Sequence, residues 1–168
     1  MTTSLTRTRA AADAMNPLPD DPKQLAEHCA AFMLSGDAPA KAFSFTLRRA
    51  SPGEAELEMT ISQAGLNVFG TCHGGVLFTL ADTAFSIACN SHGRPAVAQQ
   101  CSITFLRPAR PGDRLIAHVR ERCRTGRTAI YDCSLTNAAN GKIVAEFRGH
   151  SRIIADAMHA HAESLTAP

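Results

Sequence analysis

The sequence predicts an α+β fold in which an antiparallel sheet curls around one long, buried helix. Three observations support it. A segment that begins at Gly74 is apolar almost all round, as a buried helix is. Two segments in which apolar and polar residues alternate come before this helix, and four come after it. Runs of strands on either side of a single helix indicate an α+β protein.

A shorter helix is predicted at the start of the domain. Asp21 followed by Pro22 is a favourable cap-then-proline order for a helix N-terminus. The residues that follow keep an apolar face up to Ser35-Gly36, where the helix is expected to end. Asp37-Ala-Pro39 would then begin a further short turn.

The segments with alternating residues are predicted to be strands. Turn sequences separate several of them, at Ser51 to Gly53, at Arg124 to Arg127 and at Asn140-Gly141, of which the last is a strong two-residue hairpin signal. The strands are expected near residues 43–47, 56–61, 97–106, 115–119, 129–135 and 143–153.

One domain is expected, because 168 residues suffice for one hydrophobic core and the chain contains no internal repeat. We assign this domain to residues 21–156 and expect flexible tails at 1–20 and 157–168. The sequence has neither the apolar core of a signal peptide nor a run long enough to span a membrane. A cytoplasmic location is therefore expected.

Charge and cysteine content argue against several classes of function. The chain has 17 Lys and Arg against 15 Asp and Glu, which argues against a nucleic-acid-binding protein. Its six cysteines show no CxxC pair, and Cys72 and His73 are adjacent rather than at metal-ligand spacing, so no metal site is expected. Free thiols in a reducing cytosol are the simplest account.

Arginine is concentrated in one stretch, where seven arginines lie within 21 residues. The guanidinium group suits phosphate oxygens, so the cluster is a candidate phosphate contact. A solvated strand surface is the alternative for each of these side chains. They are Arg107, Arg110, Arg114, Arg120, Arg122, Arg124 and Arg127.

The buried helix carries the main candidate site. Gly74 and Gly75 leave its first N–H groups uncovered by side chains, where the helix dipole favours an oxyanion. Asp82 lies inside the helix, where a buried charge is costly and requires an explanation. Two alternatives stay open: the glycines serve only the turn, or Asp82 belongs to a solvated polar face. That face would comprise Thr79, Asp82, Thr83, Ser86 and Asn90.

The surrounding residues form a specific pattern. Asn67 is followed by His-Gly-Gly at 73–75, Leu-Ala-Asp-Thr-Ala-Phe at 80–85 and Ala-Cys-Asn-Ser at 88–91. This pattern resembles the hotdog-fold acyl-CoA thioesterases of the phenylacetate-degradation type. The likeness covers about residues 24–154 and continues through Phe105-Leu-Arg-Pro108, Gly112-Asp113, Tyr131-Asp132 and Phe147-Arg-Gly149. It implies a hotdog fold, an antiparallel sheet wrapped around a long central helix.

The resemblance also implies a reaction, the hydrolysis of an acyl-CoA thioester. The Gly74 N–H would polarise the thioester carbonyl, Asp82 would act as general base or nucleophile, and Asn67 would orient the thioester or the water. Thr83 would help to hold that water, and local helix hydrogen bonding is the equal alternative for its hydroxyl. No cofactor is implied, because coenzyme A is part of the substrate. The residues implied in substrate binding are His73, Gly75, Thr83, Gln99, Arg107 and Arg148.

The spacing of the two main residues has a consequence for assembly. Gly74 and Asp82 are eight residues apart, which is about 12 Å of rise along one helix. One chain therefore cannot bring both groups to a single carbonyl, whereas two antiparallel chains could. We expect at least a homodimer with the active site at its interface. The resemblance further implies a homotetramer of paired dimers.

Two other functions remain for a hotdog domain. A dehydratase or hydratase would need a differently placed His, and no matching Asp-to-His spacing occurs near Asp82. A non-catalytic acyl-CoA-binding module would be expected to lack the carboxylate. A serine hydrolase is excluded because no Gly-x-Ser-x-Gly motif occurs. The resemblance favours phenylacetyl or hydroxyphenylacetyl substrates, and medium-chain or other aryl esters stay open.

Overall fold

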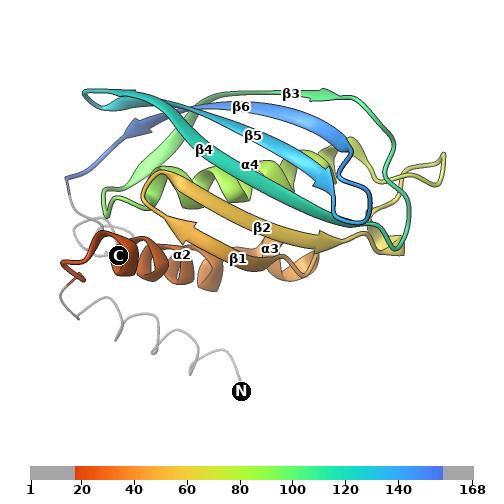
Figure 1. Ribbon diagram of the computed structural model, residues 1–168, viewed down its shortest axis with the longest axis horizontal. Coiled ribbons are helices and arrows are strands. Elements are labelled where there is room, and N and C mark those ends of the chain that lie inside the picture. The colour runs from red at the N-terminus through yellow and green to blue at the C-terminus, as the bar shows by residue number, and fades with distance from the viewer. Residues whose placement is uncertain (1–17, 157–168) are drawn as a thin grey trace, which may run out of the picture.

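The computed structural model describes residues 18–156, which form one antiparallel sheet, one long helix and two shorter α-helices (Figure 1). Of the tails expected at 1–20 and 157–168, residues 1–17 and 157–168 lie outside the described residues. In chain order the elements are α2 (Pro22–Gly36), α3 (Ala38–Ala42), β1 (Thr46–Ser51), β2 (Glu54–Thr60), the 3₁₀-helix η1 (Gln63–Gly65), α4 (Gly74–Asn90), β3 (Ala96–Phe105), β4 (Arg114–Thr125), β5 (Thr128–Asn137) and β6 (Ile143–Ile153).

The six strands pair in the order β1-β2-β4-β5-β6-β3, and every neighbouring pair is antiparallel. In Figure 1 the sheet curves over α4, which runs behind the strands, and α2 lies along the lower edge beside β1. α4 contacts every strand of the sheet. The predicted α+β class, with an antiparallel sheet wrapped around a central helix, is confirmed.

Both shorter helices begin at aspartate caps. The Asp21 side chain accepts a hydrogen bond from the Gln24 N–H at 2.8 Å, with Pro22 in the first turn, as the sequence predicts. Asp37 accepts one from the Ala40 N–H at 2.9 Å and so starts α3.

The strand predicted at 43–47 is wrong in its start, because β1 begins only at Thr46. Helix α3 occupies the chain up to Ala42, and the chain then turns through Ser44, which has a φ of 56°. Such a left-handed residue cannot belong to an extended strand. The alternating Phe43 and Phe45 that suggested the strand are instead stacked side chains with ring centroids 6.1 Å apart.

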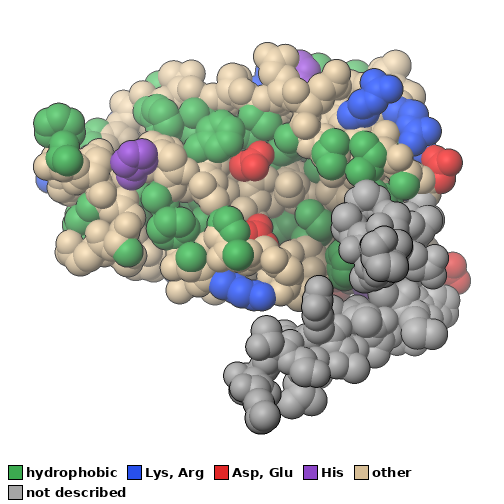
Figure 2. All heavy atoms as spheres, turned by 180° about the vertical axis from the view of Figure 1, so that it is seen from behind, with side chains coloured by type: hydrophobic (Ala, Val, Ile, Leu, Met, Phe, Trp, Pro, Cys, Tyr) green, Lys and Arg blue, Asp and Glu red, His purple; other side chains and the backbone are tan. Residues whose placement is uncertain are grey.

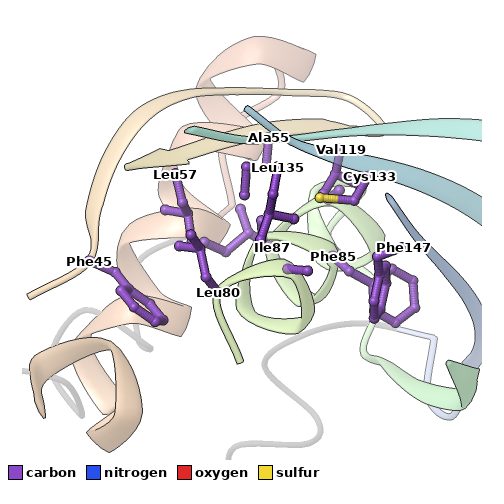
Figure 3. Packing of buried hydrophobic residues seen from close by; sticks show 14 of the residues in the cluster. Phe45, Ala55, Leu57, Leu80, Phe85, Ile87, Val119, Cys133, Leu135 and Phe147 are labelled. Carbon is purple, nitrogen blue, oxygen red and sulfur yellow. The ribbon is translucent and has the colours of Figure 1, made fainter. Parts of the chain in front are cut away.

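Apolar side chains of both layers fill the space between α4 and the sheet (Figure 3). Burying each large aliphatic or aromatic side chain contributes about 1.5–3 kcal/mol, so this layer is the main source of stability. The largest fully buried apolar residues include Leu80, Phe85 and Ile87 from α4 and Leu57, Val119 and Leu135 from the strands.

The polar side of α4 is only partly solvated. Thr83 and Asn90 are buried, and Asp82 is half-buried. The Asn90 amide is held by Ala96, since it donates to the Ala96 carbonyl and accepts from the Ala96 N–H, both at 2.9 Å. Thr79, Asp82 and Ser86 keep partial contact with solvent, so Asp82 lies at the boundary between a buried and a solvated position, where its charge still requires an explanation.

Gly149 on β6 is required by the aromatic packing of the core. A Cβ atom there would lie 2.8 Å from a ring carbon of Phe85, whose ring is fully buried between Tyr131 and Phe147. We expect Gly149→Ala to lower the free energy of unfolding by about 1–3 kcal/mol, as overpacking does. Urea unfolding measures this. Gly36→Ala is the control, because a Cβ there meets nothing within 4 Å, and an equal loss in both variants would contradict the packing argument.

Candidate active site

The start of α4 is organised by His73. Its side-chain Nδ1 accepts a hydrogen bond from the Gly75 N–H at 2.9 Å, and its own N–H donates to the Gly65 carbonyl at 2.8 Å. A ring whose Nδ1 accepts carries its proton on Nε2 in the neutral form. The Gly75 N–H is thus already engaged, and His73 acts here as a helix cap.

The Gly74 N–H is left open by this arrangement. Within residues 18–156 it donates to no backbone or side-chain acceptor. It lies at the positive end of the α4 dipole, where an anionic oxygen is favoured. The Phe105 ring lies directly over Gly74, because a Cβ added there would be 3.0 Å from a ring carbon.

Asn67 builds the loop that precedes this turn. Its Oδ1 accepts from the N–H groups of Phe69 and Thr71, at 2.9 and 3.2 Å, and its Nδ2 donates to the Thr71 hydroxyl at 3.0 Å. These bonds fold residues 67–71 into a compact turn. Val68 and Phe69 at its tip are 93% and 86% exposed.

A cleft of about 360 Å³ opens beside the helix start. Its walls are mainly apolar, and Arg107 stands among them with one guanidinium nitrogen donating to the Ile143 carbonyl at 2.8 Å. Three predicted site residues, Asn67, Gly74 and Arg107, therefore meet at one cleft. The lining residues are Asn67, Thr71, Cys72, Gly74, Leu77, Phe105, Leu106, Arg107, Pro108 and Ala109.

Asp82 lies farther along α4 in a different environment. The Cys101 thiol on β3 donates a hydrogen bond to its Oδ1, with a sulfur–oxygen distance of 3.7 Å. Burial raises the pKa of the Asp82 carboxyl above its ordinary value, the Cys101 hydrogen bond lowers it, and the negative charge of Asp37 raises it. A half-buried carboxylate with a raised pKa is a typical general base.

Thr83, the next residue, faces the start of α3. Its hydroxyl donates to Asp37 Oδ2 at 3.2 Å, and Asp37 uses its other oxygen to cap α3. Neither of the two alternatives for Thr83, a substrate contact or local helix bonding, included this partner. The bond fixes Asp37 next to Asp82.

Gly74 and Asp82 do not meet within one chain. α4 runs without interruption from Gly74 to Asn90, so the two residues keep the separation of about 12 Å that eight helical residues impose. Asp82 does not line the cleft at Gly74.

Two more predicted site residues, besides Asp82 and Thr83, lie apart from this cleft. Gln99 is exposed on β3 where the register with β6 shifts, and it does not line the cleft. Arg148 forms a two-pronged ion pair with Asp132, at 2.6 and 2.9 Å. It points to the outer face of the sheet, because its neighbour Gly149 faces α4 and side chains alternate along a strand.

The arginine-rich stretch is spread over several surfaces. Arg114, Arg120 and Arg122 are exposed and pair with carboxylates of neighbouring strands. Arg124 is half-buried and pairs with Glu121. A solvated strand surface describes the exposed three, whereas Arg107 alone among these lines the cleft at Gly74.

The cysteine near the cleft at Gly74 is a protonated thiol. All six cysteines are free thiols. Burial raises the pKa of Cys72, which lines the cleft, to about 11, so its thiol is protonated and unreactive near neutral pH. Residues 18–156 contain no group of three or more side chains placed to hold a metal ion. Within the same residues, no helix is long and apolar enough to cross a membrane.

Known proteins resemble this chain in sequence and structure. The family model described as the thioesterase superfamily matches residues 69–144. Acyl-coenzyme A thioesterase PaaI of Escherichia coli K12 is 45% identical over 122 residues, which are 73% of this chain and 86% of that protein. The structure of the E. coli PaaI protein from the phenylacetic acid degradation operon matches with a TM-score of 0.79 and 42% identity, covering 82% of this chain and 99% of that one.

A further solved structure, a Streptococcus mutans UA159 protein bound to acetyl-CoA, matches with a TM-score of 0.65 and 26% identity. The match covers 67% of this chain and 90% of that one. The segment matched by the family model contains all of α4 and β3, and with them Gly74, Asp82 and Cys101. The fold, the sequence identity and the motif at the start of α4 all indicate the same family. The chain therefore belongs to the thioesterase superfamily, as a hotdog-fold acyl-CoA thioesterase of the phenylacetate-degradation type.

Proposed function

We propose that this enzyme hydrolyses aromatic acyl-CoA thioesters of the phenylacetyl type, with Asp82 of one chain and the Gly74 N–H of another at each active site. The observation that carries the proposal is α4 itself. One unbroken helix bears an uncommitted N–H at its start, inside a cleft, and a half-buried carboxylate of raised pKa eight residues later. The enzyme needs no cofactor, because coenzyme A arrives with the substrate.

In the reaction, the thioester carbonyl oxygen points at the Gly74 N–H. A water molecule or the Asp82 carboxylate attacks the carbonyl carbon, and negative charge develops on the carbonyl oxygen. The Gly74 N–H and the helix dipole stabilise this charge. One such donor contributes about 3–4 kcal/mol to the transition state. The tetrahedral intermediate then collapses, the C–S bond breaks, and the CoA thiolate leaves and takes up a proton.

The carboxylate of Asp82 has two possible roles. As a general base it takes a proton from the attacking water. As a nucleophile it attacks the carbonyl itself, forms a mixed anhydride and is released by water. A single turnover in ¹⁸O-labelled water tests the nucleophilic role. Unlabelled product acid together with ¹⁸O in the Asp82 carboxyl marks a mixed anhydride that water opens at the Asp82 carbonyl carbon, a result that the general-base route cannot give.

A shared site requires a dimer, and β3 offers the surface for it. β3 is an edge strand of ten residues, with Val97 and Phe105 exposed. An exposed edge strand is a ready template for pairing with another chain. Figure 2 shows the face behind that of Figure 1, where hydrophobic patches surround isolated acidic side chains. Antiparallel pairing of two β3 edges would set the two α4 helices, which pack on β3, beside each other in opposite directions.

We extend this assembly to a homotetramer in the cytoplasm. The resemblance to the family supports the tetramer, and the six free thiols support a reducing compartment. Light scattering at several protein concentrations measures the assembly directly. A particle of one chain mass that is fully active would contradict the shared site.

The acyl group is assigned from the cleft and the relatives. The cleft at Gly74 has apolar walls and the Phe105 ring above the glycine, which suits a compact aromatic acyl group. The E. coli relative comes from a phenylacetic acid degradation operon. A thiol-release assay across phenylacetyl-, hydroxyphenylacetyl-, medium-chain and other aryl-CoA esters tests this. A higher kcat/KM for medium-chain esters would overturn the aromatic assignment.

Arg107 is proposed to bind a CoA phosphate at the rim of the cleft. We expect Arg107→Gln to raise KM about 3–10-fold and to leave kcat nearly unchanged, because a phosphate contact binds substrate and transition state equally. Added salt should raise the wild-type KM in the same way. Arg114→Gln is the control, since Arg114 pairs with Glu58 on the sheet surface. If KM for acyl-CoA changed neither with salt nor with Arg107→Gln, Arg107 would not bind a CoA phosphate.

A further inference from the structure

Groups from two other elements act on Asp82, one by a hydrogen bond and one by its charge, and neither belongs to the mechanism above. The Cys101 thiol reaches it from β3 at 3.7 Å. Asp37 approaches from the junction of α2 and α3 and is fixed there by two hydrogen bonds, from the Ala40 N–H at 2.9 Å and from the Thr83 hydroxyl at 3.2 Å. Since Thr83 adjoins Asp82 in α4, this second bond holds one carboxylate close to another.

We infer that Cys101 and Asp37 are positioning residues that act on Asp82 with opposite sign, Cys101 favouring its ionised form and Asp37 opposing it. The inference rests on the proposed role of Asp82 only for its kinetic consequence. Its geometric basis is a thiol donor aimed at one carboxylate oxygen and a second carboxylate held beside the same turn of α4.

The electrostatic sense of each contact follows from its chemistry. A thiol that donates to a carboxylate stabilises the negative form, because the donor hydrogen faces the charge. A second negative charge nearby destabilises it. The same interaction acts back on the thiol, because Asp82 helps burial raise the pKa of Cys101 to about 11, which keeps the S–H protonated as a donor. Burial of Asp82 remains the largest influence on its pKa.

Other ionisable groups around α4 lie in separate clusters. Cys89 lies about two turns after Asp82 in α4. The Asp82 charge helps to raise the pKa of its thiol, but the thiol donates to backbone carbonyls. Glu121 and Arg124 on β4 and Tyr131 on β5 bond to one another. His92 bonds to Glu121, and Cys133 on β5 is buried beside Glu146. Among residues 18–156, Cys101 and Asp37 are the ionisable groups that alter the pKa of the Asp82 carboxyl, in addition to the effect of burial.

The test uses three substitutions that preserve the shape of the site. Cys101→Ala removes the donor, and Cys101→Ser keeps one. Asp37→Asn removes the charge, but its side-chain oxygen can still cap α3 at Ala40 and its amide can donate to Thr83. Asparagine is as good a helix N-cap as aspartate, so this variant should fold.

Two readouts are needed, one independent of activity. The first is the pKa of Asp82 from carboxyl ¹³C NMR titration of the full-length protein, assigned with Asp82→Asn. The second is the acid limb of kcat/KM against pH, which reports the base of the free enzyme. We expect Cys101→Ala to move both upward and Asp37→Asn to move both downward, by about half a unit to one unit each. Cys101→Ser should stay near wild type.

The two readouts separate this inference from the proposed function. Opposite shifts in the NMR titration support the inference whether or not the kinetic limb follows. If the titration shifts and the limb does not, the inference stands and Asp82 is not the kinetic base. An Asp82 titration that is unchanged in both Cys101→Ala and Asp37→Asn, or that shifts in the same direction in both, overturns the inference.

Discussion

Asp82→Asn is expected to lower kcat for the best acyl-CoA substrate by about 10²–10⁴-fold, the range typical of a lost acid–base group. The amide keeps the size of the side chain and can still accept the hydrogen bond that the Cys101 thiol donates to Oδ1. It can neither take a proton from water nor attack a carbonyl. Steady-state thiol release measures the loss. The control is Asp156→Asn, which removes an exposed carboxylate paired with Arg94 and should leave kcat unchanged.

The stability of the same variant shows whether the fold survives. Burial raises the pKa of Asp82 in the folded state above its ordinary value of 3.8, so the folded chain holds a proton there more tightly than the unfolded chain does. The ionised carboxylate therefore costs folding free energy at pH above the raised pKa, and this cost vanishes below the ordinary one. Asp82→Asn should thus have a higher Tm than wild type at neutral pH, and the difference should shrink on acidification. A lower Tm at neutral pH would attribute the loss of activity to structural damage.

Local signals in the sequence were sufficient to predict most elements of the fold. Asp21-Pro22 marks the start of α2, and His-Gly-Gly at 73–75 marks the start of α4, because caps and uncovered N–H groups are properties of neighbouring residues. The strand expected at 43–47 failed because α3 and the left-handed Ser44 precede β1. Alternating Phe43 and Phe45 look alike in a strand and in a turn with stacked rings.

The candidate site could be predicted only in part, for a related reason. Gly74 and Asp82 belong to one helix, so their separation follows from the sequence. Cys101 and Asp37 are 19 and 45 residues from Asp82, and no local pattern indicates that β3 and the α2–α3 junction converge there. The burial of Thr83 on the polar side of α4 could not be predicted, because its partner Asp37 comes near only when the chain is folded.

Gly74→Pro isolates the other half of the site. Proline removes the backbone N–H that is proposed to hold the oxyanion, yet it is favoured at the first position of a helix. The preceding residue, His73, already has φ −64° and ψ 135°, the extended conformation that proline requires before it. We expect kcat to fall about 10²–10³-fold, as for other lost oxyanion donors. Gly74→Ala is the matched control, because it adds the same Cβ against Phe105 and keeps the N–H.

Mixing the two inactive variants tests the shared site. If each site takes Asp82 from one chain and the Gly74 N–H from its partner, an Asp82→Asn chain paired with a Gly74→Pro chain forms one intact site and one doubly disabled site. Random exchange of equal amounts should then restore about a quarter of the wild-type activity, because half of the dimers are mixed and half of their sites are intact.

The control mixes either single variant with chains that carry both substitutions, and this mixture should stay inactive. If exchange is demonstrated by mass spectrometry and no activity returns, the two residues do not act across an interface. Recovery would require two antiparallel α4 helices to face each other, which is the one arrangement that overcomes the separation of about 12 Å within a single helix.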